Sequence, residues 1–146
     1  MSEVQVAKEI AKRAHAGQVD KSGVAYIGHP ERVAHWVARM GGSSRAVAAA
    51  WLHDVVEDSP WTLEDLRAAG ISGRTCRIVD LMTKKPGQGA EEYFRALRSD
   101  SEARLVKMAD LADNTSPERL ALLDASTRER LMAKYSRSRE LLLGAG

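Results

Sequence analysis

The sequence contains 146 residues, of which 44% are hydrophobic and 29% are charged, and its net charge at pH 7 is +2. This length suits one compact domain with its own hydrophobic core. So small a net charge gives no reason to expect binding to nucleic acid or to a membrane surface. The single cysteine, Cys76, excludes an intramolecular disulfide, and neither a signal peptide nor a membrane-spanning apolar run is recognisable. We therefore expect a single-domain cytoplasmic protein over residues 1–146.

Helix signals recur in the first half of the chain, whereas strand signals are almost absent. Ser2 suits the N-cap of a first helix, and turn-forming residues predict a loop over residues 18–28. Pro30 fits the first position of a second helix, and Ser43 or Ser44 fits the start of a third, alanine-rich helix. The first half is therefore predicted to be helical apart from that loop.

The second half continues this pattern. Thr62 and Asp65 form a capping-box pattern before a short helix. Further helices are expected from Ser72 to about residue 83, over 90–98 and 101–113, at Pro117, and from Thr127 to Leu143. The segments between helices are short and the sequence has no internal repeat, so the expected fold class is all-α, in one helical domain.

The run from His53 to Asp58, His-Asp-Val-Val-Glu-Asp, is the first segment that suggests chemistry. If the third helix continues through it, His53 lies one turn before Glu57, and Asp54 lies one turn before Asp58. An acidic helix end is the simplest alternative, but acidic residues are unfavourable at the C-terminal end of a helix dipole. A cluster of acids at that end therefore suggests a bound cation.

Two distant residues strengthen the case for a metal. His29 precedes Pro30 at a loop–helix junction, where the imidazole is held in a fixed direction. Asp110 lies in an otherwise apolar helical segment, and a buried carboxylate is normally paired or bound to a metal. Lys107, one turn earlier, is the alternative partner, so a plain ion pair remains open for this segment.

Six features occur in order along the chain: Ala14-His15-Ala16-Gly17-Gln18, Tyr26-Ile27-Gly28-His29-Pro30, His53-Asp54-Val55-Val56-Glu57-Asp58, Leu81-Met82-Thr83-Lys84, Val106-Lys107-Met108-Ala109-Asp110, and then Asn114. Together they resemble the motifs of the HD-domain hydrolases of the RelA/SpoT type. The resemblance extends from about residue 4 to about residue 140. Members of this type without a synthetase domain are stand-alone small alarmone hydrolases, including those of metazoans.

The resemblance implies a helical bundle around one divalent metal, usually Mn²⁺, bound by His29, His53, Asp54 and Asp110. Such proteins remove the 3′-pyrophosphate from (p)ppGpp, the guanosine alarmones of the stringent response. Two imidazoles and two carboxylates form a mixed site that suits Mn²⁺, Fe²⁺ or Zn²⁺ better than Ca²⁺ or Mg²⁺.

Two further acids of the same run have predicted catalytic roles. Glu57 is expected to position the attacking water and accept its proton, and Asp58 to support it. A non-catalytic nucleotide sensor is the alternative, but it would not need these two carboxylates.

Substrate contacts follow from the resemblance as well. Lys21, Lys84, Asn114 and Tyr135 match positions that contact the nucleotide in such hydrolases. For each lysine, a solvated surface charge is an equal alternative, and Tyr135 fits a core position of the last helix. The expected partner is a small-molecule nucleotide; no nucleic acid or membrane is expected, and a homodimer is left open.

One position departs from the pattern. Asp20 stands where the family has an arginine that packs on the guanine base. An aspartate cannot stack in this way, although it can accept hydrogen bonds from a purine edge. The expected substrate is therefore (p)ppGpp, with another nucleotide such as (p)ppApp as the alternative.

Overall fold

The computed structural model describes residues 1–144, which form ten helices and no named strand. The all-α prediction is thus confirmed. None of the described helices is long and apolar enough to cross a membrane. The helices are α1 (Glu3–Ala14), α2 (Gly28–Arg39), α3 (Ser44–Leu52), α4 (Val55–Asp58), α5 (Leu63–Ala68), α6 (Gly73–Met82), α7 (Ala90–Arg98), α8 (Ser101–Asn114), α9 (Pro117–Leu120) and α10 (Ala125–Leu143).

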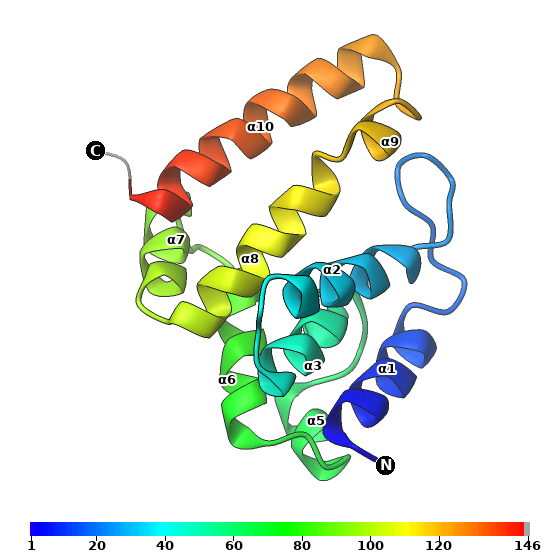
Figure 1. Ribbon diagram of the computed structural model, residues 1–146, viewed down its shortest axis with the longest axis vertical. Coiled ribbons are helices and arrows are strands. Elements are labelled where there is room, and N and C mark those ends of the chain that lie inside the picture. Colours follow the sequence, from blue (N-terminus) through cyan, green and yellow to red (C-terminus); the bar gives the residue numbers. More distant parts are fainter. Residues whose placement is uncertain (145–146) are drawn as a thin grey trace.

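Helix α3 is the centre of the bundle and contacts α1, α2, α6 and α8 (Figure 1). Its small side chains allow this close approach on several sides, since Ala46, Ala48, Ala49 and Ala50 are all fully buried. The long helix α10 packs on α7 and α8, and the short α9 joins it to α8. Elements distant in sequence therefore meet around α2, α3 and α8.

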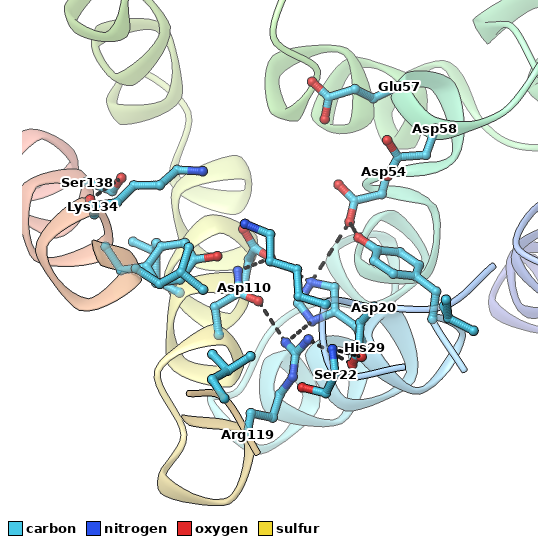
Figure 2. Close-up of a pocket in the computed structure, with 18 of the residues that line it drawn as sticks. Asp20, Ser22, His29, Asp54, Glu57, Asp58, Asp110, Arg119, Lys134 and Ser138 are labelled. Carbon is cyan, nitrogen blue, oxygen red and sulfur yellow. Dashed lines mark hydrogen bonds and ion pairs between the residues drawn. The ribbon is translucent and has the colours of Figure 1, made fainter. Parts of the chain in front are cut away.

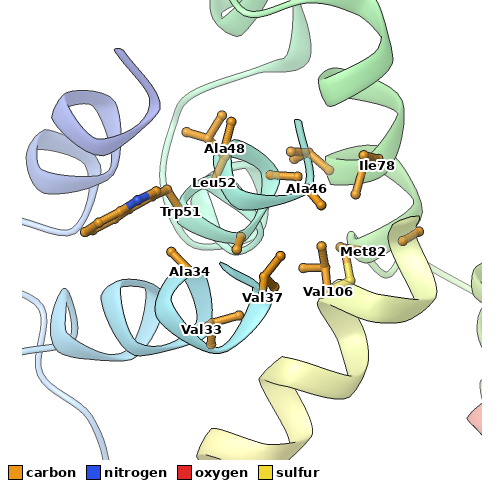
Figure 3. Packing of buried hydrophobic residues seen from close by; sticks show 14 of the residues in the cluster. Val33, Ala34, Val37, Ala46, Ala48, Trp51, Leu52, Ile78, Met82 and Val106 are labelled. Atoms are coloured by element: carbon orange, nitrogen blue, oxygen red, sulfur yellow. The ribbon is translucent and has the colours of Figure 1, made fainter. Parts of the chain in front are cut away.

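The hydrophobic core fills the space between these helices (Figure 3). The cluster includes Val33 and Val37 of α2, Leu52 of α3, Ile78 of α6 and Val106 of α8, and all five are fully buried. Burial of such side chains contributes about 1.5–3 kcal/mol each to the free energy of folding. The core thus fixes the relative positions of the helices whose ends carry the predicted site.

Leu52 provides a test of this packing. Leu52→Ala is expected to lower the free energy of unfolding by about 2–5 kcal/mol, because it leaves a cavity at the centre of the bundle. The matched change Leu122→Ala, at a side chain that is 61% exposed, should cost less than about 0.5 kcal/mol. Urea denaturation of both variants measures the difference, and equal losses would contradict this description of the core.

Most predicted helix starts are confirmed by their capping hydrogen bonds. The hydroxyls of Ser2, Ser43 and Thr62 each accept a backbone N–H from the first turn that follows. The second helix begins at Gly28, so Pro30 is not its first residue. Pro30 still lies in the first turn, where a missing N–H costs no intrahelical hydrogen bond.

The prediction that one helix continues through the His53–Asp58 run was wrong. Helix α3 ends at Leu52, and the backbone turns at His53 and Asp54 before the four-residue helix α4. The His53 ring contributes to this ending, because its Nδ1 lies 2.6 Å from the carbonyl oxygen of Ala50 and satisfies a helix-terminal acceptor. The Asp58 N–H still donates to the Asp54 carbonyl (2.9 Å), so their one-turn spacing is kept.

Candidate active site

The four predicted metal ligands come together from three parts of the chain, α2, the α3–α4 junction and α8. The Nε2 atoms of His29 and His53 lie 2.8 Å and 3.3 Å from Oδ1 of Asp110. Oδ2 of Asp54 lies 3.0 Å from Nε2 of His53. Ligand atoms of His29, His53 and Asp54 all lie within 4.8 Å of one another, a group that could hold a metal ion. Figure 2 shows Asp54, His29 and Asp110 converging on this point.

Both imidazoles turn Nε2 toward the carboxylates of the cluster. A carbonyl oxygen can only accept, so Nδ1 of His53 must donate to Ala50. In the same way, Nδ1 of His29 donates to Oδ2 of Asp113 at 2.7 Å. With its proton held on Nδ1, the neutral form of each ring leaves Nε2 free to bind a metal. Nε2 of His53 is buried and has no hydrogen-bond partner among the described residues.

These residues fit a divalent cation. A buried polar atom without a hydrogen-bond partner, such as Nε2 of His53, is costly. A metal between the rings and the carboxylates would remove this cost. The mixed nitrogen and oxygen donors suit a transition metal more than Ca²⁺ or Mg²⁺.

The ionisation of the buried groups agrees with a cationic centre. Burial opposes the charged form of Asp110, but the Lys107 ammonium and the His29 and His53 rings hold its pKa well below the usual value. Lys107 lies 3.0 Å from Oδ2 of Asp110, so the alternative ion pair exists alongside the metal-ligand geometry. Oδ1 faces the imidazoles while Oδ2 faces the lysine, and the two roles are therefore compatible.

Asp113 is a functional candidate that the sequence analysis missed. It is buried, receives the His29 ring, and is held by Arg32 (Nε to Oδ1, 2.8 Å) and by Arg119 (Nη1 to Oδ2, 3.0 Å). Carboxylates that accept from a metal-bound histidine orient the ring and raise its basicity. Its position three residues after Asp110, on the same face of the helix, could have identified it.

Removal of Asp113 gives a testable consequence. Asp113→Ala is expected to weaken binding of a divalent metal by about 10–100-fold, because the His29 ring loses its fixed orientation. Titration of chelator-treated protein with Mn²⁺ measures the affinity. Asp80→Ala, at a half-buried acid of α6 that is not part of the ligand cluster, serves as the matched control. An unchanged affinity in Asp113→Ala would mean that the ring is held by other contacts.

Glu57 and Asp58 stand beside the cluster, at the edge of the same pocket (Figure 2). Partial burial and the charge of Asp54 raise the pKa of both carboxyl groups. Tyr26, part of the Tyr-Ile-Gly-His-Pro segment, donates a hydrogen bond to Oδ2 of Asp54. Two carboxylates of raised pKa next to a candidate metal are suited to accept a proton from water.

The cluster opens into a pocket of about 510 Å³, within the range that holds a small ligand. Of the predicted substrate residues, Lys21, Asn114 and Tyr135 line this pocket, whereas Lys84 does not. The amide of Asn114 is engaged, because its Nδ2 donates to Asp110 (3.3 Å) and its Oδ1 accepts from Arg119 (2.8 Å). The backbone of Lys84 lies against Glu57 and partly offsets the rise of its pKa.

The carboxylate of Asp20 is occupied by the protein itself. Its Oδ1 accepts the backbone N–H groups of Ser22 (2.8 Å) and Val24 (3.0 Å). Its Oδ2 accepts from Nη2 of Arg119 at 3.4 Å. Asp20 therefore shapes its loop and contacts an arginine of α9, a residue that no sequence motif had indicated.

Comparisons with known proteins identify the family of this chain. The chain matches the model of the HD domain family over residues 7–145. It is 39% identical over 116 residues to a guanosine-3′,5′-bis(diphosphate) 3′-pyrophosphohydrolase of Haemophilus influenzae, covering 72% of this chain and 17% of that protein. It is 34% identical over 120 residues to the protein of the same description in Aquifex aeolicus, covering 77% and 17%.

These relatives are much longer, since the chain spans only 17% of their length. The structure of a metazoan ortholog of SpoT that hydrolyzes ppGpp superposes with a TM-score of 0.79 at 21% identity. That match covers 100% of this chain and 88% of the metazoan one, and it shows a shared fold. From the family match and the clustered histidines and aspartates, we conclude that the chain belongs to the HD-domain family.

Proposed function

We propose that this protein is a metal-dependent hydrolase that removes the 3′-pyrophosphate from an alarmone such as (p)ppGpp. The observation that carries the proposal is the convergence of the Nε2 atoms of His29 and His53 on the carboxylates of Asp54 and Asp110 beside a pocket. The two relatives named above carry the corresponding activity in their descriptions. Because this chain spans only 17% of the length of these relatives, the same activity is a proposal for this chain.

His29, His53, Asp54 and Asp110 would hold one divalent ion, for which we propose Mn²⁺. When bound, such an ion lowers the pKa of water and polarises a phosphoryl oxygen. Glu57, supported by Asp58, would position the water and take its proton. The water oxygen forms a bond to the phosphorus next to the ribose, the bond from that phosphorus to O3′ breaks, and O3′ gains a proton. The products are pyrophosphate and a nucleoside 5′-diphosphate from ppGpp, or a 5′-triphosphate from pppGpp.

The charge distribution in the pocket supports a polyphosphate substrate. Lys21, Lys107, Arg119 and Lys134 all line the pocket, opposite or beside the acids of the candidate metal site. Among the described residues, neither Lys21 nor Lys134 has a carboxylate within 4.0 Å. Cations without counter-ions favour binding of phosphate oxygens. A nucleotide with two diphosphate groups carries many such oxygens.

A second nucleotide is a specific alternative because Asp20 occupies the position of the family arginine. Its contacts within the loop and to Arg119 give it a structural role, and the preference between guanine and adenine has to be measured. A sensor without turnover is a second alternative.

We also propose a cytoplasmic location, in keeping with the single buried cysteine, Cys76.

A substrate panel separates these alternatives. The protein is freed of metal with a chelator, loaded with Mn²⁺, and incubated with ppGpp, ppApp, ATP or dGTP, and the products are identified by anion exchange. We expect conversion of ppGpp to GDP and pyrophosphate, and no conversion without a divalent metal. Faster turnover of ppApp would replace guanine by adenine in the proposal. Tight nucleotide binding without turnover would instead support the sensor.

A further inference from the structure

The pocket loop, residues 18–25, forms one wall of the pocket and carries Lys21. Its base is held by a bridge between Val19 and Ala25 and by the bond from the Tyr26 N–H to the Gln18 carbonyl (2.9 Å). Beyond this base, the loop buries little apolar surface, since Val19 and Val24 are 62% and 45% exposed. Segments with few buried contacts open at low free energy unless a polar tie holds them.

Asp20 is the exception in this loop, because its side chain is only 10% exposed and points into the protein. Its Oδ1 closes the loop on itself through the N–H groups of Ser22 and Val24. Its Oδ2 reaches out of the loop to Arg119. Among the described residues, Arg119 is the only side chain outside the loop that hydrogen-bonds to residues 19–24.

Arg119 is itself fixed on the opposite side. Its Nη1 donates to Oδ1 of Asn114 (2.8 Å) and to Oδ2 of Asp113 (3.0 Å), the carboxylate that orients the His29 ring. The planar guanidinium can serve these acceptors and Asp20 together because its donors form a rigid fork. Figure 2 shows the Arg119 side chain beside both Asp20 and His29. The Arg119 side chain thus joins the pocket loop to Asp113, the carboxylate that orients a ligand of the candidate metal site.

We propose that Asp20 and Arg119 form a latch that holds the pocket loop closed and so positions Lys21 for substrate phosphate. Both are positioning residues, which act on the substrate through Lys21 and the loop. The functional part of this inference rests on the proposed hydrolase activity, whereas the closure of the loop does not. The latch also gives Asp20 a role that does not involve reading the base.

Limited proteolysis tests loop closure without any substrate. Trypsin can cut after Lys21 in the pocket loop, and after Lys84, an exposed residue outside that loop in the segment after α6, which serves as an internal reference. Asp20→Asn keeps an oxygen for the N–H groups of Ser22 and Val24 but loses the charge that pairs with Arg119. We expect cleavage after Lys21 to become about tenfold faster relative to cleavage after Lys84. An unchanged ratio would overturn the latch.

A second variant changes the other member of the pair, Arg119. Arg119→Gln should accelerate the same cleavage, and Arg104→Gln, at an exposed arginine of α8, is the matched control that should not. Because Arg119 also supports Asp113, the Mn²⁺ content of each variant is measured in parallel. Acceleration in Arg104→Gln as well would show a general loosening of the fold and contradict a specific latch.

Kinetics then test whether the latch acts through Lys21. Asp20→Asn is expected to raise KM for ppGpp about fivefold to tenfold while kcat stays within about twofold, because binding and not chemistry is impaired. Lys21→Ala should raise KM by a larger factor in the wild-type background than in Asp20→Asn, since residues that act together are not additive. Additive effects would overturn the positioning role. If the wild-type protein hydrolyses no nucleotide, the proposed function fails, and the proteolysis result still decides whether the latch exists.

Discussion

His53→Ala is expected to abolish bound metal and to reduce turnover by at least about 10³-fold, because the variant loses a ligand and the metal-activated water together. His53 is the ligand with the strongest structural argument. It is 1% exposed, its Nδ1 is fixed by Ala50, and its Nε2 has no hydrogen-bond partner among the described residues. Elemental analysis of the purified variant, together with its rate of ppGpp hydrolysis, measures both losses.

The matched control for this change is His35→Ala. His35 is an exposed histidine of α2 that is not part of the ligand cluster, so both metal content and turnover should stay at the wild-type level. Circular dichroism establishes that His53→Ala remains folded, since removal of a buried ring also leaves a cavity. A folded His53→Ala protein that keeps its metal and its activity would refute the assignment of the site.

Glu57→Gln is expected to lower kcat by about 10²–10⁴-fold while metal content stays unchanged. Glutamine has the same shape but cannot accept the proton of the attacking water. Glu57 lies at the pocket beside the candidate ligands, and no described contact joins its carboxylate to a histidine of the cluster. The variant therefore separates proton transfer from metal binding, which His53→Ala does not.

Glu64→Gln, at an exposed acid of α5, controls for the loss of one negative charge. Stopped reactions at saturating ppGpp give kcat for both variants, and the metal is quantified in the same samples. If kcat were retained in Glu57→Gln and lost in Asp58→Asn, the two carboxylates would exchange their proposed roles. Retention in both variants would contradict carboxylate-assisted attack.

The ligand cluster could be predicted from the sequence because each of its members breaks a local pattern. His53 and Asp54 follow an apolar helix, Asp110 interrupts one, and His29 stands at a helix start before a proline. Buried polar residues of this kind need a partner, which makes them recognisable without any structure. The structure brings all four together, and their binding of a metal remains a proposal.

Contacts that depend on the packing of distant segments could not be predicted. The pairing of Asp20 with Arg119 joins residues 99 positions apart, and no periodicity links them. The ending of α3 at Leu52 was also missed, because the ring of His53 satisfies a backbone acceptor that sequence alone leaves unassigned. Lys84 was assigned to the substrate site from a sequence motif alone. The path of the chain after α6 places it outside the pocket lining, and the motif does not specify that path.

Hydrolysis of ppGpp in ¹⁸O-labelled water, with Mn²⁺-loaded protein and mass spectrometry of the products, tests the central proposal most directly. Attack of water on the phosphorus next to the ribose predicts one ¹⁸O atom in the released pyrophosphate and none in GDP. The reaction should stop when the metal is removed and resume when it is restored. Absence of these products with every divalent metal supplied would contradict the proposed function, and label in GDP would contradict attack at phosphorus.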